Sequence, residues 1–133
     1  MPFVADNSVV IAWFSRSQAT AYTDRMYRRL EKDELLVPSV WPYEFANALA
    51  VLERRKVLTA ALVDEIVRKA ARLANRIDAP PASPAALLAV ARRHALSAYD
   101  AAYLELAERL QIPLAAKDSP LAAAAIKLGL LAA

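Results

Sequence analysis

Apolar residues recur along this sequence in two patterns, short continuous runs and stripes with a period near 3.6 residues. The runs end in polar residues or proline and predict buried strands. Strands are expected at residues 3–5, 35–37 and 113–116, with shorter candidates at 76–78 and 130–131. The stripes predict amphipathic helices. Helices are expected at residues 9–14, 18–30, 42–56, 59–75, 85–94, 97–110 and 119–128.

Strands that alternate with helices are joined by crossover connections, which make a parallel sheet covered on both faces. We therefore predict an α/β fold with a parallel central sheet of four to five short strands flanked by helices on both faces. The length of 133 residues suits one domain spanning 1–133. The proline-rich turn at residues 80–84 is short enough to be a connection rather than a linker. In such sheets ligands bind beyond the carboxyl ends of the strands.

Cysteine is absent and glycine and histidine occur once each, which excludes several classes of chemistry. The absence of cysteine excludes disulfide scaffolds, zinc ribbons and cysteine nucleophiles, and a single glycine, Gly129, excludes glycine-rich phosphate loops. The single histidine, His94, ends a predicted helix, where the helix dipole favours it, and a Ser-His-Asp triad would depend on it alone. Carboxylates, hydroxyls, arginine and lysine remain for catalysis.

Charge and hydropathy indicate the surroundings of the protein. With 17 basic and 14 acidic residues the net charge is +3, which suits nucleic acid or an acidic protein as partner, although a basic solvated surface gives the same count. No uncharged apolar stretch reaches the ~18 residues that cross a bilayer. The first residues lack a basic region and meet Asp6 at once, unlike a signal peptide. We expect a cytoplasmic protein without membrane association.

Four of the acids lie in apolar surroundings, unlike the others. Asp6 and Asp118 follow predicted strands, whereas Glu44 and Asp100 fall in the first turns of predicted helices. A parallel sheet would bring all four to the same edge. Because two carboxylates ~5 Å apart repel by about 3 kcal/mol, such a cluster takes up protons or binds a hard cation such as Mg²⁺ or Mn²⁺.

Each acid also has a purely structural interpretation. Asp6 could cap the helix that follows it, and Asp118 could be a cap or turn residue. Asp100 could answer Ser97 in a capping box, and Glu44 could favour its helix N-terminus through the dipole.

Three segments contain the first three of these acids: VADNSV at residues 4–9, VPSVWPYEFANAL at 37–49 and LSAYDAAYLELA at 96–107. Together they resemble the PIN domain, and specifically the VapC-type ribonuclease toxins of prokaryotic toxin–antitoxin pairs. They occur in the family's order and spacing, and the resemblance runs over essentially the whole chain.

The resemblance implies a metal-dependent endoribonuclease that hydrolyses RNA phosphodiester bonds and leaves a 5′-phosphate and a 3′-hydroxyl. It implies a homodimeric toxin inhibited by a cognate antitoxin. Asp6, Glu44, Asp100 and Asp118 then match the catalytic acids. Asp6 and Asp100 would hold Mg²⁺ or Mn²⁺, with Glu44 and Asp118 completing the shell through waters or a second ion. Ser8 matches the hydroxyl that supports them.

The chain departs from the family pattern at the fourth acid. The family often has T-x-D there, whereas this sequence has Ala116-Lys117-Asp118, which puts the role of Asp118 in question. Lys117 could neutralise Asp118, contact a phosphate or point away.

Other residues could hold RNA or a partner protein. Basic candidates for RNA are Arg16, Arg54, Arg55, Lys56, Arg92, Arg93 and Lys117. Trp13, Trp41, Tyr43 and Tyr99 could stack on bases, although core packing explains them as well. The apolar helices at 9–14 and 46–52 are candidate contact faces for an antitoxin or a second copy.

One other class of protein remains as an alternative, and two further classes do not fit the residues after the first strand. A PIN-like module could bind RNA or protein without cutting. A phosphoacceptor receiver domain would need adjacent acids after the first strand, and a haloacid-dehalogenase-type phosphatase would need D-x-D there. Asp6-Asn7-Ser8 fits neither pattern.

Overall fold

The centre of the fold is a four-stranded parallel sheet in the order β3-β2-β1-β4. The computed structural model describes residues 1–73, 75–78 and 81–133. The strands are β1 (Phe3–Ala5), β2 (Leu35–Pro38), β3 (Asn75–Asp78) and β4 (Leu114–Ala115). Leu131 adds only an isolated bridge to Leu114. The predicted α/β class with a parallel sheet is confirmed.

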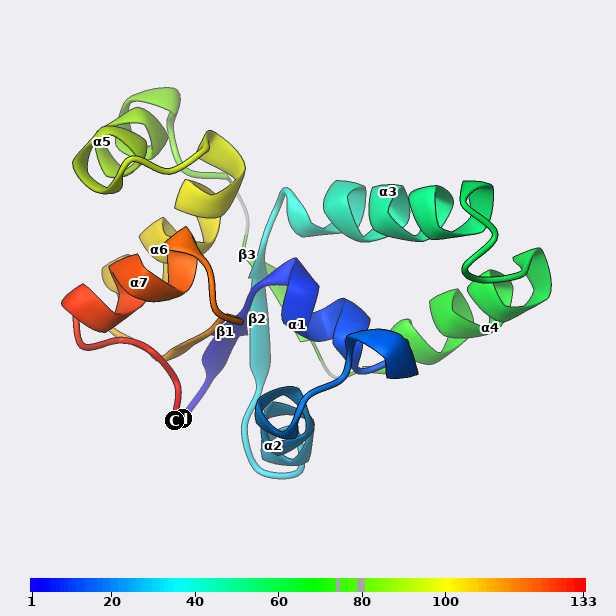
Figure 1. Cartoon of the computed structure of the whole chain (residues 1–133). Coiled ribbons are helices and arrows are strands. Elements are labelled where there is room, and N and C mark those ends of the chain that lie inside the picture. Colours follow the sequence, from blue (N-terminus) through cyan, green and yellow to red (C-terminus); the bar gives the residue numbers. More distant parts are fainter. Residues whose placement is uncertain (74, 79–80) are drawn as a thin grey trace.

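Helices cover both faces of this sheet, as predicted. They are α1 (Asn7–Ala12), α2 (Ala21–Arg29), α3 (Trp41–Arg54), α4 (Ala60–Ala70), α5 (Pro84–His94), α6 (Ala98–Leu110) and α7 (Pro120–Lys127), with a short 3₁₀ helix, η1, at Arg16–Gln18. Figure 1 shows α5, α6 and α7 on one side of the strands and α1, α3 and α4 on the other. Among the described residues no helix has the length and apolar character needed to span a membrane.

Two predicted boundaries need correction. The helix predicted at 59–75 ends at Ala70, and Asn75 already pairs with Leu35 in the sheet. The first helix begins at Asn7 rather than at residue 9. Residue 74, at the end of the predicted helix, and residue 80, in the predicted 80–84 turn, lie outside the described residues, as does residue 79.

Hydroxyl side chains fix where several helices begin. Thr59, Ser83, Ser97 and Ser119 each accept a hydrogen bond from the backbone N–H three residues later, at 3.1–3.2 Å. Such caps satisfy N–H groups that have no partner within the helix. The cap formed by Ser97 holds the first turn of α6, and with it Asp100, in a fixed position at the edge of the sheet.

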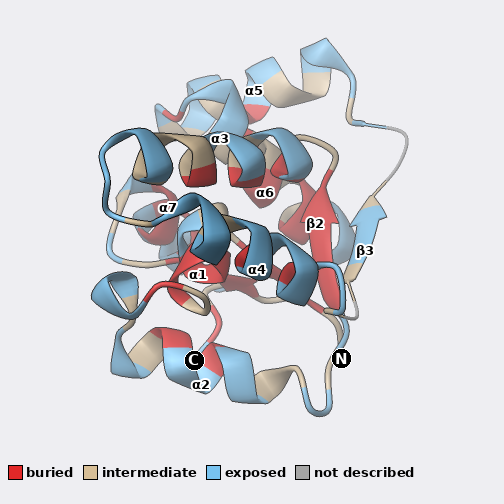
Figure 2. Ribbon diagram, turned by 90° about the vertical axis from the view of Figure 1, so that its right-hand side faces the viewer, coloured by how far each residue is buried: buried red, intermediate tan, exposed pale blue. Residues whose placement is uncertain are grey.

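The core lies between the sheet and the inner faces of the helices. Figure 2 shows that β2 is buried along its length, and β1 is buried as well. Val9, Val10 and Ile11 of α1 are also buried, so most of the helix predicted at 9–14 is core and is not open to a partner protein. α6 packs against β1 and β2 and buries Tyr103 completely.

Candidate active site

A pocket of about 600 Å³ opens beyond the carboxyl ends of β1 and β4. All four predicted acids and Ser8 line it. The full set is Asp6, Asn7, Ser8, Ile11, Gln18, Glu44, Ala48, Val51, Leu52, Asp100, Lys117, Asp118, Ser119 and Leu121. Its location is the one that a parallel sheet favours for ligands. We call it the carboxylate pocket.

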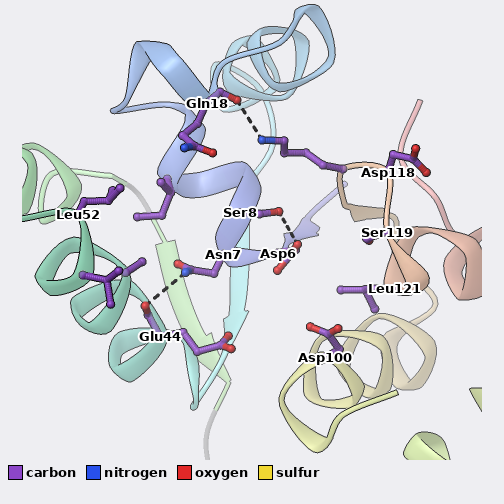
Figure 3. Close-up of a pocket in the computed structure, with 14 residues that line it drawn as sticks. Asp6, Asn7, Ser8, Gln18, Glu44, Leu52, Asp100, Asp118, Ser119 and Leu121 are labelled. Atoms are coloured by element: carbon purple, nitrogen blue, oxygen red, sulfur yellow. Dashed lines mark hydrogen bonds between the residues drawn. The ribbon is translucent and has the colours of Figure 1, made fainter. Parts of the chain in front are cut away.

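Three of the acids converge inside this pocket. Figure 3 shows Asp6, Glu44 and Asp100 directed toward a common centre from the end of β1 and the first turns of α3 and α6. Burial is the largest cause that raises the pKa of each carboxyl. The charge of Asp6 raises the pKa of Glu44 and Asp100 further, and Asp100 also raises that of Glu44. The cluster therefore favours protons or a cation.

Asp6 is not used as a helix cap. It occupies the N-cap position of α1, but its side chain makes no capping hydrogen bond. The Ser8 hydroxyl instead donates to Asp6 Oδ2 at 2.6 Å, and this bond lowers the pKa of Asp6 against the effect of burial. That contact is what the predicted supporting role of Ser8 requires.

The carboxylate of Asp100 likewise does not act as a helix cap. Ser97 Oγ accepts a hydrogen bond from the Asp100 backbone N–H at 3.1 Å, which is half of a capping box. The second bond of a capping box would run from the Ser97 backbone N–H to the Asp100 carboxylate. Both residues are described by the structure, and this bond is absent between them. The structural interpretation of Asp100 as a capping-box partner is therefore wrong.

Tyr103 holds Glu44 in place, and sequence reasoning missed it. Its hydroxyl donates to Glu44 Oε1 at 2.7 Å, and its side chain is fully buried on α6, one turn after Asp100. Burial, with the nearby carboxylates, raises the pKa of Tyr103 far above its usual range, so the hydroxyl stays protonated and donates. A signal was present, because a tyrosine in an apolar run needs a hydrogen-bond partner and the i, i+3 spacing places it beside Asp100.

Asp118 lies apart from the other three acids. Its side chain is exposed, and Figure 3 shows its carboxylate turned away from Asp6 and Asp100 at the upper rim of the pocket. It is no helix cap either, because Ser119 caps α7. All four acids thus lie at the same edge of the sheet, as expected, but Asp118 stands outside the cluster of the other three. Two residues separate the end of β4 from Asp118, and these carry it beyond the cluster.

The residues of the cluster fit a hydrated divalent cation. No three His, Cys, Asp or Glu side chains in the described ranges are arranged to hold one ion directly. Mg²⁺ in proteins is typically held by one or two carboxylates and keeps several waters. The Asn7 Oδ1 atom, in the same pocket, is buried without a hydrogen-bond partner among the described residues. An ion-bound water could donate to this oxygen.

We expect these carboxyls to lower the stability of the metal-free protein as pH rises from about 4 toward 7. Their pKa values are raised in the folded state, so the folded chain binds more protons in that range. The destabilisation is absent below the ordinary carboxyl pKa and is complete once the pH has passed the folded-state pKa.

Urea unfolding in EDTA at a series of pH values tests this expectation. Asp100→Asn should unfold at higher urea near neutral pH and show a flatter pH dependence than Asp64→Asn, an exposed acid on α4. Identical curves for the two variants would contradict it.

The structure leaves some of the predicted RNA-contact residues exposed and places others in the core or away from the carboxylate pocket. Trp13 and Trp41 pack inward, since Trp13 Nε1 donates to the Thr23 carbonyl at 2.9 Å and Trp41 stacks on Phe45 at 4.9 Å between ring centroids. Tyr43 and Tyr99 are 78% and 62% exposed, so core packing does not explain them. Of the basic candidates only Lys117 lines the carboxylate pocket within the described residues.

Comparison with known proteins places these observations in a family. The model of the PIN domain family matches residues 3–127, a range that contains the whole carboxylate pocket. The crystal structure of PAE2754 from Pyrobaculum aerophilum is similar to this chain, with a TM-score of 0.68 and 26% sequence identity. The match covers 92% of this chain and 78% of that one. A search of curated proteins gives no match.

Proposed function

The chain belongs to the PIN-domain family, generally a nuclease fold, and on this premise we propose that it is a Mg²⁺- or Mn²⁺-dependent endoribonuclease. The convergence of Asp6, Glu44 and Asp100 in one pocket carries the proposal. Carboxylates that repel one another at the edge of the sheet suit a hard cation, and a bound cation can in turn bind the phosphate of a phosphodiester.

Asp6 and Asp100 would hold the ion, because they face each other and their charges interact. Ser8 keeps Asp6 in position through its 2.6 Å hydrogen bond. Tyr103 orients the Glu44 carboxylate toward the same centre, where it can hold a water. A bound divalent ion lowers the pKa of a coordinated water and stabilises negative charge on phosphate. Asp118, at the rim, would act at most through water or a second ion.

We further propose that the nuclease is the toxin of a toxin–antitoxin pair, inhibited by a cognate antitoxin and assembled as a homodimer. Support comes from the resemblance of the three sequence segments to VapC-type toxins. The hairpin of α3 and α4 adds support, because Val57, Leu62 and Val67 are exposed aliphatic side chains there. Exposed apolar patches are typical of protein contact surfaces.

RNA cleavage by the purified protein tests the nuclease proposal. Total RNA should be cut into discrete fragments with Mg²⁺ or Mn²⁺, and EDTA should abolish cleavage because the carboxylates alone cannot activate water. Adding Mn²⁺ back in excess of EDTA should restore the same fragments, which excludes irreversible unfolding.

Two outcomes would overturn the proposal. Cleavage that continues at full rate in EDTA would contradict metal dependence and point to a contaminating nuclease. Saturable Mn²⁺ binding by a folded protein that cuts neither total RNA nor individual transfer and ribosomal RNAs would support the alternative, a catalytically silent PIN-like binding module.

A further inference from the structure

A second pocket, of about 440 Å³, adjoins the carboxylate pocket and shares Lys117 and Asp118 with it. The rest of its lining comes from the start of α2, from the loop after β4, from α7 and from the last residues of the chain. These residues are Thr20, Tyr22, Ala116, Ala122, Ile126 and Leu131. The two pockets meet at the loop between β4 and α7, where an extended ligand could pass from one to the other.

Lys117 lies at this junction, and its ammonium group has N–H donors available for a ligand. Its Nζ donates to the Gln18 carbonyl oxygen at 3.0 Å, the bond drawn from Gln18 in Figure 3. None of the ion pairs among the described residues includes Lys117, so Asp118 does not neutralise it. An ammonium group has three N–H donors, and two remain for a ligand. Of the alternatives for this lysine, contact with a phosphate is the one that its position favours.

The second pocket offers an apolar surface beside an aromatic ring and cations. Ile126 is 61% exposed at its rim, while Ala122 is buried in its wall. The Tyr22 hydroxyl donates to the Ala132 carbonyl at 3.0 Å, which fixes the ring, and the Arg25 guanidinium lies 5.5 Å from the ring centroid. Unstacked nucleobases bind to apolar and aromatic surfaces of this kind, with cations nearby for the backbone.

We propose that the second pocket binds the nucleotide next to the scissile phosphate of a single-stranded RNA, and that Lys117 contacts the phosphate between the two pockets. The proposal rests on the proposed function, which makes the carboxylate pocket the place of the scissile phosphate. RNA is favoured over an apolar protein segment because the pocket adjoins that site and because the cationic Lys117 lines both pockets.

Two substitutions test the two parts of this subsite. Lys117→Gln removes the charge but keeps a donor for the Gln18 carbonyl. Ile126→Glu places a negative charge at the pocket rim. The matched controls are Lys32→Gln and Leu88→Glu, which make comparable changes at exposed positions that line neither pocket. Circular dichroism and thermal unfolding establish that all four variants fold.

Binding of a short fluorescent single-stranded RNA is measured by anisotropy in EDTA over a series of salt concentrations. Each test variant should bind about tenfold more weakly than the parent. Lys117→Gln should also reduce the slope of log K against log salt by about 0.7, because one phosphate contact is lost. In Mn²⁺ both variants should raise KM for RNA more than they lower kcat, and Lys117→Arg should restore most of the affinity. The controls should match the parent.

The outcomes separate this proposal from the proposed function. A parent that cuts RNA, with test variants that bind and cut equally well, overturns the nucleotide subsite alone and leaves the pocket to a protein segment. A parent that binds RNA without cutting, with test variants that bind more weakly, upholds the subsite and contradicts the nuclease. A parent that neither binds nor cuts RNA contradicts both.

Discussion

Asp100→Asn is expected to reduce metal-dependent RNA cleavage roughly 100-fold or more, because a lost ionic ligand removes several kcal/mol of stabilisation of the ion and its bound water. The Asp100 carboxylate faces Asp6 in the carboxylate pocket and bonds to no other group in the described structure. Asparagine keeps the size of the side chain and the backbone N–H that Ser97 caps, so the fold should be retained. Initial cleavage rates in Mn²⁺ and Mn²⁺ affinity by calorimetry measure the effect.

The same change at other acids provides the controls. Asp64→Asn, on the exposed face of α4, should cut like the parent. Asp118→Asn should lose less activity than Asp100→Asn, because Asp118 is exposed and turned away from the cluster. If the protein is a toxin, its expression should arrest bacterial growth, and Asp100→Asn should relieve the arrest. An Asp100→Asn protein that cuts RNA as fast as the parent would refute the assigned site.

Tyr103→Phe is expected to destabilise the protein by about 1.5–3 kcal/mol near neutral pH, because a buried hydrogen bond to a charged carboxylate is lost. The loss should fall toward about 1 kcal/mol at lower pH, where Glu44 is protonated and the bond joins neutral groups. The Tyr103 hydroxyl lowers the pKa of Glu44 against the effect of burial, so its removal raises that pKa further. Cleavage should slow roughly tenfold as Glu44 loses its orientation.

Tyr99→Phe is the matched control for this variant. It removes a hydroxyl from the same helix, but Tyr99 is mostly exposed and makes no hydrogen bond within the described residues. Urea unfolding of both variants at about pH 4, below the ordinary pKa of a glutamate, and at about pH 7, with EDTA, separates the contribution of the Glu44 charge from that of the hydroxyl itself. Equal destabilisation of Tyr103→Phe at both pH values would show that the charge of Glu44 plays no part.

The sequence predicts the fold well where burial alone decides the structure. The runs at 3–5 and 35–37 are fully buried strands, and Ser97 and Ser119 mark helix starts because their hydroxyls cap the first turn. The pattern is misleading where Leu73 continues the period of α4, because pairing of β3 with β2 decides the structure there. Local periodicity carries no information about such tertiary pairing.

The sequence also identifies the acids of the site but not their supports. Asp6, Glu44 and Asp100 are recognisable because each is an acid in an apolar run. The partners of the site are far apart in the sequence, with a separation of 59 positions from Glu44 to Tyr103 and of 99 positions from Gln18 to Lys117. Contacts of that separation depend on the packing of the whole fold, which a single sequence does not reveal. The outward turn of Asp118 depends on the same packing.

The order of the strands has a consequence for the synthesis of this protein. β1 leaves the ribosome first, yet it lies in the middle of the sheet and its partner β4 follows about a hundred residues later in the chain. Until α6 and β4 emerge, Asp6 and Glu44 have no Asp100 beside them, and one edge of β1 is unpaired. An interrupted translation product would therefore lack the complete carboxylate cluster but expose a strand edge that favours aggregation. The carboxylate cluster is thus completed only late in synthesis, at the stage when β4 also covers the open edge of β1.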